Sequence, residues 1–314
     1  MTKRTFAPTE WFHLTELSHA AVLSGLLAAR RWTGGELKFQ GGTSLHLVYG
    51  SPRFSEDLDF VTATTKGLQG AMRAAAPHVE AAFRREFPKL TATVKVRDEE
   101  GVPYPRNPRL FTLTLSEPDW FQSLKVKVEF FIIPEQICAE YEAAVRPFAP
   151  LWPNLRVDLP QVNIETASMM EILCDKLHAL GDRARLKERD VFDLWWICAQ
   201  TGLTARQAAE QFGLRYEHHV AMYPNGKRLP DLAVSLRERA ASLVGNATRI
   251  TSFEQASQAI ARWLPLDNGR PNILASETNI RAMIQQAAQC AVETANVIDG
   301  ICAPPGDNPC EVEP

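Results

Sequence analysis

Hydrophobic residues recur with two different periods along this chain, and the change between them marks its organisation. A helical period predicts a helix over residues 10–32, which Thr9 can cap and which ends at Gly34-Gly35. An alanine-rich helical pattern follows over residues 67–86, and a short helix is expected from Thr43 to Tyr49. Strand patterns are expected at residues 37–40, 58–61, 90–97, 110–115 and 124–133.

Helical patterns dominate the second half, because the strand patterns mostly stop after Pro134. Residues 147–160 contain prolines and are interpreted as a connection. Residues 301–314 combine Pro, Gly and acidic residues, so a disordered tail is expected. The expected helices cover residues 165–182, 187–201, 204–212, 230–243, 252–263 and 276–297. The pattern therefore predicts an α+β protein, with a mixed β-sheet in the N-terminal half and a mainly helical C-terminal half.

Composition narrows the class of protein. The 314 residues are 45% hydrophobic and 23% charged, which is typical of a soluble globular protein of two domains or one large domain. A net charge of −3 argues against a protein that coats nucleic acid, although a local basic cleft is compatible with it. The six cysteines form no CxxC pair, and no signal peptide or membrane-spanning run is evident. We expect a cytoplasmic protein with reduced thiols and no membrane partner.

The segment Asp57-Leu58-Asp59 carries the first candidate chemistry. Side chains alternate along a strand, so Asp57 and Asp59 point to one face while Leu58 and Phe60 point into the core. Two neighbouring carboxylates repel each other unless a cation lies between them. Mg²⁺ prefers one or two carboxylates together with phosphate oxygens and waters, and a pair of such ions can clamp a displacement at phosphorus. An isolated Asp-x-Asp is more often a solvated strand edge, so the surrounding residues decide the interpretation.

Those surrounding residues suit a phosphate. Gly41-Gly42 opens the short helix, and glycine lets the backbone approach a ligand closely. The first N–H groups of a helix have no partner within it and can face an anion. Thr43 and Ser44 add hydroxyl donors, and Arg53 adds a fixed positive charge. A glycine pair before a helix is usually only a turn, but a strand, Gly-Gly, a short helix and Arg-x-Ser-x-Asp-x-Asp together are far more specific.

The residues Gly41–Leu45 and Arg53–Phe60 resemble the signature of the AbiEii-type nucleotidyltransferases, which are toxins of type IV toxin–antitoxin and abortive-infection systems related to the MenT toxins. The match is dense over residues 38–61, recurs around 171–196 and extends in organisation over 10–265. The resemblance implies a nucleotidyltransferase-like sheet domain over residues 1–147 and a helical domain over 148–300 that completes the cleft. It also implies that Asp57 and Asp59 bind Mg²⁺ or Mn²⁺. The nucleotide-binding residues expected from the motifs are Gly41, Gly42, Thr43, Ser44, Arg53, Ser55 and Lys176, with Thr43 in place of the family's serine.

A third carboxylate is expected on a neighbouring strand, as in nucleotidyltransferases of this fold. Glu129 is the best candidate, because Lys125, Lys127 and Glu129 share one face of a predicted strand that follows the Asp57–Asp59 strand. A charged strand face either lies in solvent or lines a site. Glu129 is therefore predicted to be a metal ligand or the base for an acceptor hydroxyl, and the two lysines could steer phosphate.

A second charged block lies on the helices around residues 171–193. Leu173, Leu177 and Leu180 form one buried stripe, and Asp190 and Asp193 share a face of the next helix. An arbitrary pair of such helices would carry solvated charges. The resemblance instead implies that Lys176 contacts the NTP phosphates and that Asp190 lies near the metal or the attacking group, while Asp193 is left to cap a helix or to pair with Arg183 or Arg189. His178 is interpreted as a packed or surface residue.

The function predicted from these features is metal-dependent transfer of a nucleotide from an NTP to an acceptor. The resemblance implies that the acceptor is RNA, such as a tRNA 3′ end, and that a cognate antitoxin is a partner. Two alternatives stay open: transfer to a protein or small molecule, and a catalytically silent module that binds nucleotide or antitoxin. The paired carboxylates argue against the silent module, because it has no need to hold two repelling groups together.

Overall fold

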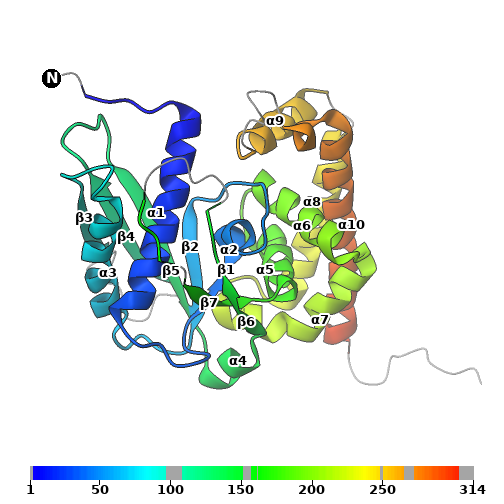
Figure 1. The fold of residues 1–314 in the computed structure, drawn as a ribbon. Helices are drawn as coiled ribbons and strands as arrows, with labels where there is room; N and C mark the ends of the chain where they lie inside the picture. The colour runs from blue at the N-terminus through cyan, green and yellow to red at the C-terminus, as the bar shows by residue number, and fades with distance from the viewer. Residues whose placement is uncertain are drawn as a thin grey trace, which may run out of the picture. The chain divides into compact units, whose positions relative to one another are not determined.

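The computed structural model describes residues 3–96, 108–150, 157–160, 162–247, 250–264 and 272–303 (Figure 1). The chain divides into two compact units. The first comprises Met1–Ile172, Val220–Pro224 and Ala261–Asn272 and holds the sheet; the second comprises Leu173–His219, Asn225–Ile260 and Ile273–Pro314 and is helical. No helix among the described residues is long and apolar enough to cross a membrane. This organisation confirms the predicted α+β class.

A seven-stranded mixed sheet, in the order β3-β4-β5-β2-β1-β7-β6, forms the centre of the first unit. Strands β2 and β5 run parallel, as do β1 and β7, and the other neighbours are antiparallel. The strands are β1 (Lys38–Gln40), β2 (Asp57–Thr62), β3 (Thr91–Val96), β4 (Arg109–Ser116), β5 (Leu124–Ile132), β6 (Ala143–Pro147) and β7 (Asn163–Ala167).

Alternation along the strands separates a core face from a polar face. On β5, Val126, Val128 and Phe130 are fully buried, whereas Lys125 and Lys127 are exposed on the opposite face. Helices α1 (Pro8–Ala29) and α3 (Leu68–Phe83) pack against each other and share one hydrophobic core with the buried residues of the strands. The helices cover the apolar face of the sheet, so the opposite, polar face can hold a functional site.

Helix α1 begins earlier than the sequence pattern predicted, and Thr9 is not its cap. The N-cap is Ala7, followed by Pro8 at the first helical position, and the Ala7 N–H donates to Glu10 Oε2 over 2.9 Å. Proline suits this position because its missing N–H would have had no partner in the helix. Residues from Leu14 to Leu26 are buried all round, which is typical of a helix inside a core rather than on its surface.

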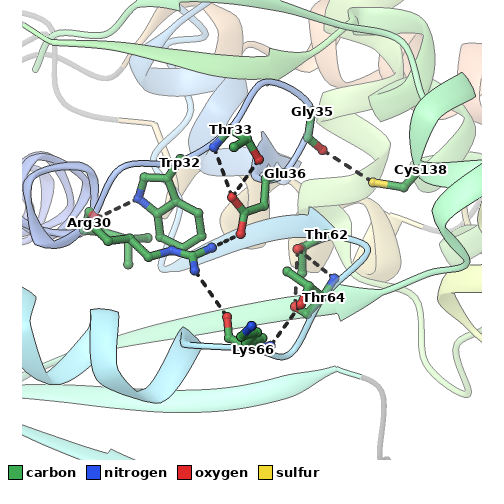
Figure 2. A network of polar contacts seen from close by, with 10 residues as sticks. Arg30, Trp32, Thr33, Gly35, Glu36, Thr62, Thr64, Lys66 and Cys138 are labelled. Atoms are coloured by element: carbon green, nitrogen blue, oxygen red, sulfur yellow. Dashed lines mark hydrogen bonds and ion pairs between the residues drawn. The ribbon is translucent and has the colours of Figure 1, made fainter.

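The connection from α1 to β1 is held by a polar network around Arg30 and Glu36 (Figure 2). Glu36 accepts hydrogen bonds from Arg30 and from the N–H and hydroxyl of Thr33, while the Arg30 guanidinium lies 3.8 Å from the ring centroid of Trp32. These contacts lower the pKa of Glu36, despite the opposing effect of its partial burial. The network fixes where β1 begins, and β1 leads directly into the segment with the candidate site.

Two parts of the sequence interpretation need correction. Strands β6 and β7 lie beyond Pro134, where strands were expected to have mostly stopped, and β7 occupies the start of the predicted helix 165–182. They are short, and β6 is largely exposed, so they lack the hydrophobic alternation that marks longer strands. Also, the short helix expected from Thr43 to Tyr49 begins and ends two residues earlier, because Gly41 and Gly42 are the first residues of α2 (Gly41–Leu47).

The second unit is made of helices, several of which pack against α10. The longest is α10 (Glu277–Cys302), which contacts α6 and α8. Close approach depends on small residues: a side chain at Gly181 would overlap Leu232 and Leu236. The tail predicted at residues 301–314 begins within α10, and its residues from 304 onward lie outside the described part of the chain. The helices that belong wholly or in part to this unit are α5 (Met169–Asp182), α6 (Glu188–Thr201), α7 (Ala205–Met222), α8 (Leu229–Ala247), α9 (Ile250–Ala261) and α10, with the short η1 (Ile273–Ala275) before the last.

Candidate active site

Strand register brings three of the predicted carboxylates together on the polar face of the sheet. Asp57 and Asp59 are half-buried on β2, while Leu58 and Phe60 are fully buried on the opposite face. Glu129 on β5 is the register partner of Asp59, since β2 and β5 pair in parallel. Directly paired residues project from the same face of a sheet. The carboxylates expected from the sequence are thus neighbours in space, although Glu129 is 70 residues from Asp59 along the chain.

The chemistry of these donors fits a hard divalent cation. Asp57 and Asp59 offer the two carboxylates that Mg²⁺ accepts when substrate phosphates and waters supply its other ligands. Lys127 pairs with one of them: its Nζ is 3.5 Å from Asp57 Oδ1, and its side chain is 51% exposed. Within the described ranges, no three His, Cys, Asp or Glu side chains are grouped so as to hold a metal ion. The assignment of Glu129 as a third ligand stays a prediction.

Gly41 and Gly42 allow α2 to lie against these side chains. Gly41 has a φ of +79°, which L side chains rarely adopt, and a Cβ there would overlap the Asp59 carboxylate. A Cβ on Gly42 would overlap the guanidinium of Arg53 and lie 2.9 Å from Ser55 Oγ. Both positions therefore require glycine for close packing around Asp59 and Arg53.

The polar residues of the motif are engaged by the protein itself. Thr43 donates its hydroxyl hydrogen bond to the carbonyl oxygen of Asp57, and Ser44 Oγ donates to Gly41 O over 2.8 Å. Arg53 is 1% exposed, and its Nη1 donates to Phe54 O over 2.6 Å. These contacts tie α2 and the following loop to the start of β2. The predicted contacts of Thr43, Ser44, Arg53 and Ser55 with nucleotide stay predictions.

A buried pair of histidines positions the loop before β2. His46 Nδ1 lies 2.7 Å from Ser51 O, so it carries a hydrogen, and Nε2 lies 2.9 Å from Glu16 Oε1. A hydrogen bond therefore joins that nitrogen to the carboxylate. His19 Nε2 donates to Glu56 O over 2.9 Å, and burial lowers the pKa of His19 to about 4, so it stays neutral near neutral pH. These residues were not predicted from the sequence, although Glu16 and His19 are polar positions within a largely apolar helix and could have indicated them.

The second predicted block forms a buried ion cluster within the helical unit. Lys176 Nζ lies 3.2 Å from Asp190 Oδ1 and 3.2 Å from Asp193 Oδ2, and Arg183 pairs with the other oxygen of Asp190. Burial lowers the pKa of Lys176, but the neighbouring aspartates outweigh it and raise the pKa above its usual value. Asp193, for which a cap or a pairing with Arg183 or Arg189 was considered, thus pairs with Lys176. Roles of Lys176 and Asp190 toward NTP stay predictions.

A mixed sheet with paired carboxylates on one strand and a third opposite them, joined to a helical unit, has the architecture of a nucleotidyltransferase. The solved structure of MenT4, a nucleotidyltransferase toxin from Mycobacterium tuberculosis, shares this fold. Its TM-score is 0.56 at 18% identity, covering 94% of this chain and 95% of MenT4. JHP933 from Helicobacter pylori is also similar, with a TM-score of 0.49, 18% identity and coverage of 93% and 97%.

Sequence comparison defines the family. The sequence-family model described as the nucleotidyl transferase AbiEii toxin of type IV toxin–antitoxin systems matches residues 26–261. The chain therefore belongs to this family. No curated protein sequence matches the chain. The family membership confirms the resemblance predicted from Gly41–Leu45 and Arg53–Phe60.

Proposed function

We propose that this protein transfers a nucleoside monophosphate from an NTP to RNA in the presence of Mg²⁺ or Mn²⁺, as the toxin of a type IV toxin–antitoxin pair. The observation that carries the proposal is the register of β2 and β5, which sets Glu129 directly opposite Asp59 on the face that also presents Asp57. Membership of the AbiEii family supports nucleotidyl transfer as the reaction and an antitoxin as a partner.

The reaction forms a bond between an acceptor hydroxyl oxygen and the α-phosphorus of the NTP, and breaks the bond from that phosphorus to pyrophosphate. A divalent cation, when bound, neutralises charge on the phosphates. Asp57 and Asp59 are the residues that would hold it. Lys127, which pairs with Asp57 in the structure, would then pair with a phosphate instead. Glu129 would serve as a further ligand or accept the hydroxyl proton. Gly42, Thr43 and Arg53 shape the loop that presents the two aspartates.

Incubation with α-labelled NTPs, Mg²⁺ and total RNA tests the reaction. Label in RNA supports the proposal, label in protein or in a small molecule supports the first alternative, and no label supports a silent binding module. The decisive variant is Asp59→Asn, which should abolish transfer while leaving the fold intact. Its stability without metal should hold or rise, because one of two neighbouring carboxylates is neutralised.

Asp158→Asn is the matched control, because it makes the same chemical change at an exposed aspartate of the sheet unit. It should keep wild-type transfer. Full activity in Asp59→Asn would contradict the assignment of the carboxylates, whatever acceptor is found.

A further inference from the structure

A cavity of about 500 Å³ opens beside Asp57 in the sheet unit. Its residues come from α1, from the loop before β2, from the start of β2 and from strands β3, β4 and β5. They are of three kinds: aromatic groups (Trp11, Phe12, Phe54), hydroxyl groups (Thr15, Thr112, Thr114) and lysines (Lys95, Lys125, Lys127), with Glu56, Asp57 and Leu124 completing the wall. The motif Arg53–Phe60 supplies Phe54, Glu56 and Asp57, whereas the residues from α1, β3 and β4 belong to no motif of the sequence.

The lysines and threonines are aligned by strand register. Lys95 on β3 pairs with Thr112 on β4, Thr112 pairs with Lys127 on β5, and Lys127 pairs with Asp57 on β2. This row crosses four adjacent strands and ends at the candidate catalytic carboxylate. With strands about 4.8 Å apart, the row extends roughly 14 Å from Asp57 to Lys95. Thr114 and Lys125 form a second, parallel row.

The spacing of the charges distinguishes a polymer from a single nucleotide. The backbones of Lys95 and Lys127 are two strands apart, or about 10 Å, so the row presents its lysines at successive positions across the sheet. A triphosphate requires converging donors, whereas a nucleic-acid strand presents its phosphates at successive positions. Within the described residues, no carboxylate lies within ion-pair distance of Lys95 or Lys125. Both are exposed and available to phosphate.

The aromatic wall supplies the second half of the recognition. Trp11 and Phe12 are partly exposed near the start of α1, and the Phe12 and Phe54 rings are 4.9 Å apart. Bases stack on such rings with little regard to sequence, and single-strand binding sites combine this stacking with a basic groove along the backbone. A double helix would keep its bases stacked on one another and away from these rings.

We infer that this cavity is the acceptor site and that it binds a single-stranded stretch of RNA. The phosphates lie along the Lys95–Thr112–Lys127 row, the bases stack against Trp11 and Phe12, and the reactive hydroxyl is directed toward Asp57. This inference rests on the proposed function for the identity of the reaction, but the binding it describes needs neither NTP nor metal. Because the chain has a net charge of −3, its overall charge does not attract an anionic polymer, and a local row of lysines is needed to do so.

The test measures binding of a fluorescent single-stranded RNA of about 12 nucleotides, a length within the usual range for such sites, by anisotropy without NTP or Mg²⁺. Lys95→Glu and Lys125→Glu should each weaken binding by about 10-fold or more. Each should also reduce the slope of log K against log salt by about 0.7 for every phosphate that the variant no longer neutralises. Lys89→Glu, the same charge change at an exposed lysine of this unit outside the cavity, should bind like wild type.

Two further measurements test base stacking and the distinction between RNA binding and NTP binding. Phe12→Leu should weaken RNA binding while retaining the cooperative thermal unfolding of wild type. In transfer assays, Lys95→Glu should raise the KM for RNA and leave the KM for NTP unchanged.

Each contrary outcome is informative. Wild-type affinity in Lys95→Glu and Lys125→Glu, tighter binding of a duplex of equal length, or a rise only in the KM for NTP would overturn the acceptor site. If RNA binding depends on Lys95 but labelled NTP never reaches RNA, then the proposed reaction fails and the RNA-binding surface stands. If transfer to RNA persists with no dependence on these lysines, then the reaction stands and this site is wrong.

Discussion

Replacing Lys176 by methionine is expected to destabilise the helical unit strongly. Methionine has nearly the length of lysine without its charge, so the change removes the ammonium that lies 3.2 Å from both Asp190 and Asp193. Asp193 is fully buried and Asp190 is 1% exposed, so water cannot replace the missing ammonium. Removing one member of a buried ion pair costs about 3–5 kcal/mol, because the remaining charge is left desolvated. We expect a loss in this range, toward its lower end because Arg183 still pairs with Asp190.

The pH dependence supplies a signature that a simple packing defect would not produce. Burial raises the pKa of Asp190, but Lys176 and Arg183 outweigh it and lower the pKa from 3.8 to about 2. A carboxyl with a lowered folded pKa stabilises the fold above its unfolded pKa, and this stabilisation is lost as the pH falls through the folded value. The contribution is about 2 kcal/mol. Since Lys176→Met removes much of it, the gap between variant and wild type should narrow between neutral pH and about pH 3.

Urea denaturation followed by tryptophan fluorescence and circular dichroism measures both effects. Fluorescence reports on the helical unit through Trp195 and Trp196, which lie on α6 beside the cluster. Lys187→Met is the matched control, because Lys187 is exposed and lies in the same segment. Ordinary surface substitutions change the free energy of unfolding by up to about 0.5 kcal/mol. If Lys176→Met and Lys187→Met differ by no more than this, the predicted loss of the buried ion pair is wrong. A gap that stays constant with pH would refute the electrostatic part of it.

The remaining predictions concern catalysis and the loop before β2. Lys176→Ala should reduce kcat/KM for NTP by roughly 10- to 150-fold. Lys176→Arg should retain the fold and show a smaller reduction. Equal kinetics in Lys176→Ala and Lys187→Ala would show that Lys176 has no role toward nucleotide. Gly42→Val should displace Arg53, cost about 1–3 kcal/mol and weaken NTP binding, whereas Gly70→Val, where nothing lies within 4 Å of the added Cβ, should not affect binding. Unchanged NTP affinity in Gly42→Val would show that the glycines serve packing alone. Wild type should lose about 3 kcal/mol as the pH falls from 6.5 to 4 through His19, because the unfolded chain binds a proton that the buried neutral imidazole does not. His19→Gln keeps an N–H donor and should flatten this slope in urea titrations; an unchanged slope would exclude His19 as its source.

The sequence alone determined the elements that have long, regular hydrophobic patterns. Helices α1, α3 and α10 and strands β3 to β5 form where periodicity predicted them, because a repeated apolar face can be buried only in the matching secondary structure. The alternation in Asp57–Phe60 also determined that both aspartates share a face, since a strand permits no other arrangement. The motif around them was enough to predict the family, and the sequence comparison confirms it.

Only the tertiary structure decided which distant residues meet. Strand β7 forms by pairing with β1, and β6 by pairing with β7, while their own sequences carry too little hydrophobic alternation to predict strands. The contact between Glu16 on α1 and His46 on α2 joins residues that are 30 positions apart in the chain. The row from Lys95 to Asp57 depends on the register of four strands, and a slip of one residue would turn every lysine to the opposite face. Phe111 and Val128 are buried on the other face, and the half-buried Val94 packs against the same core, so the core of this protein helps to determine where its charges lie.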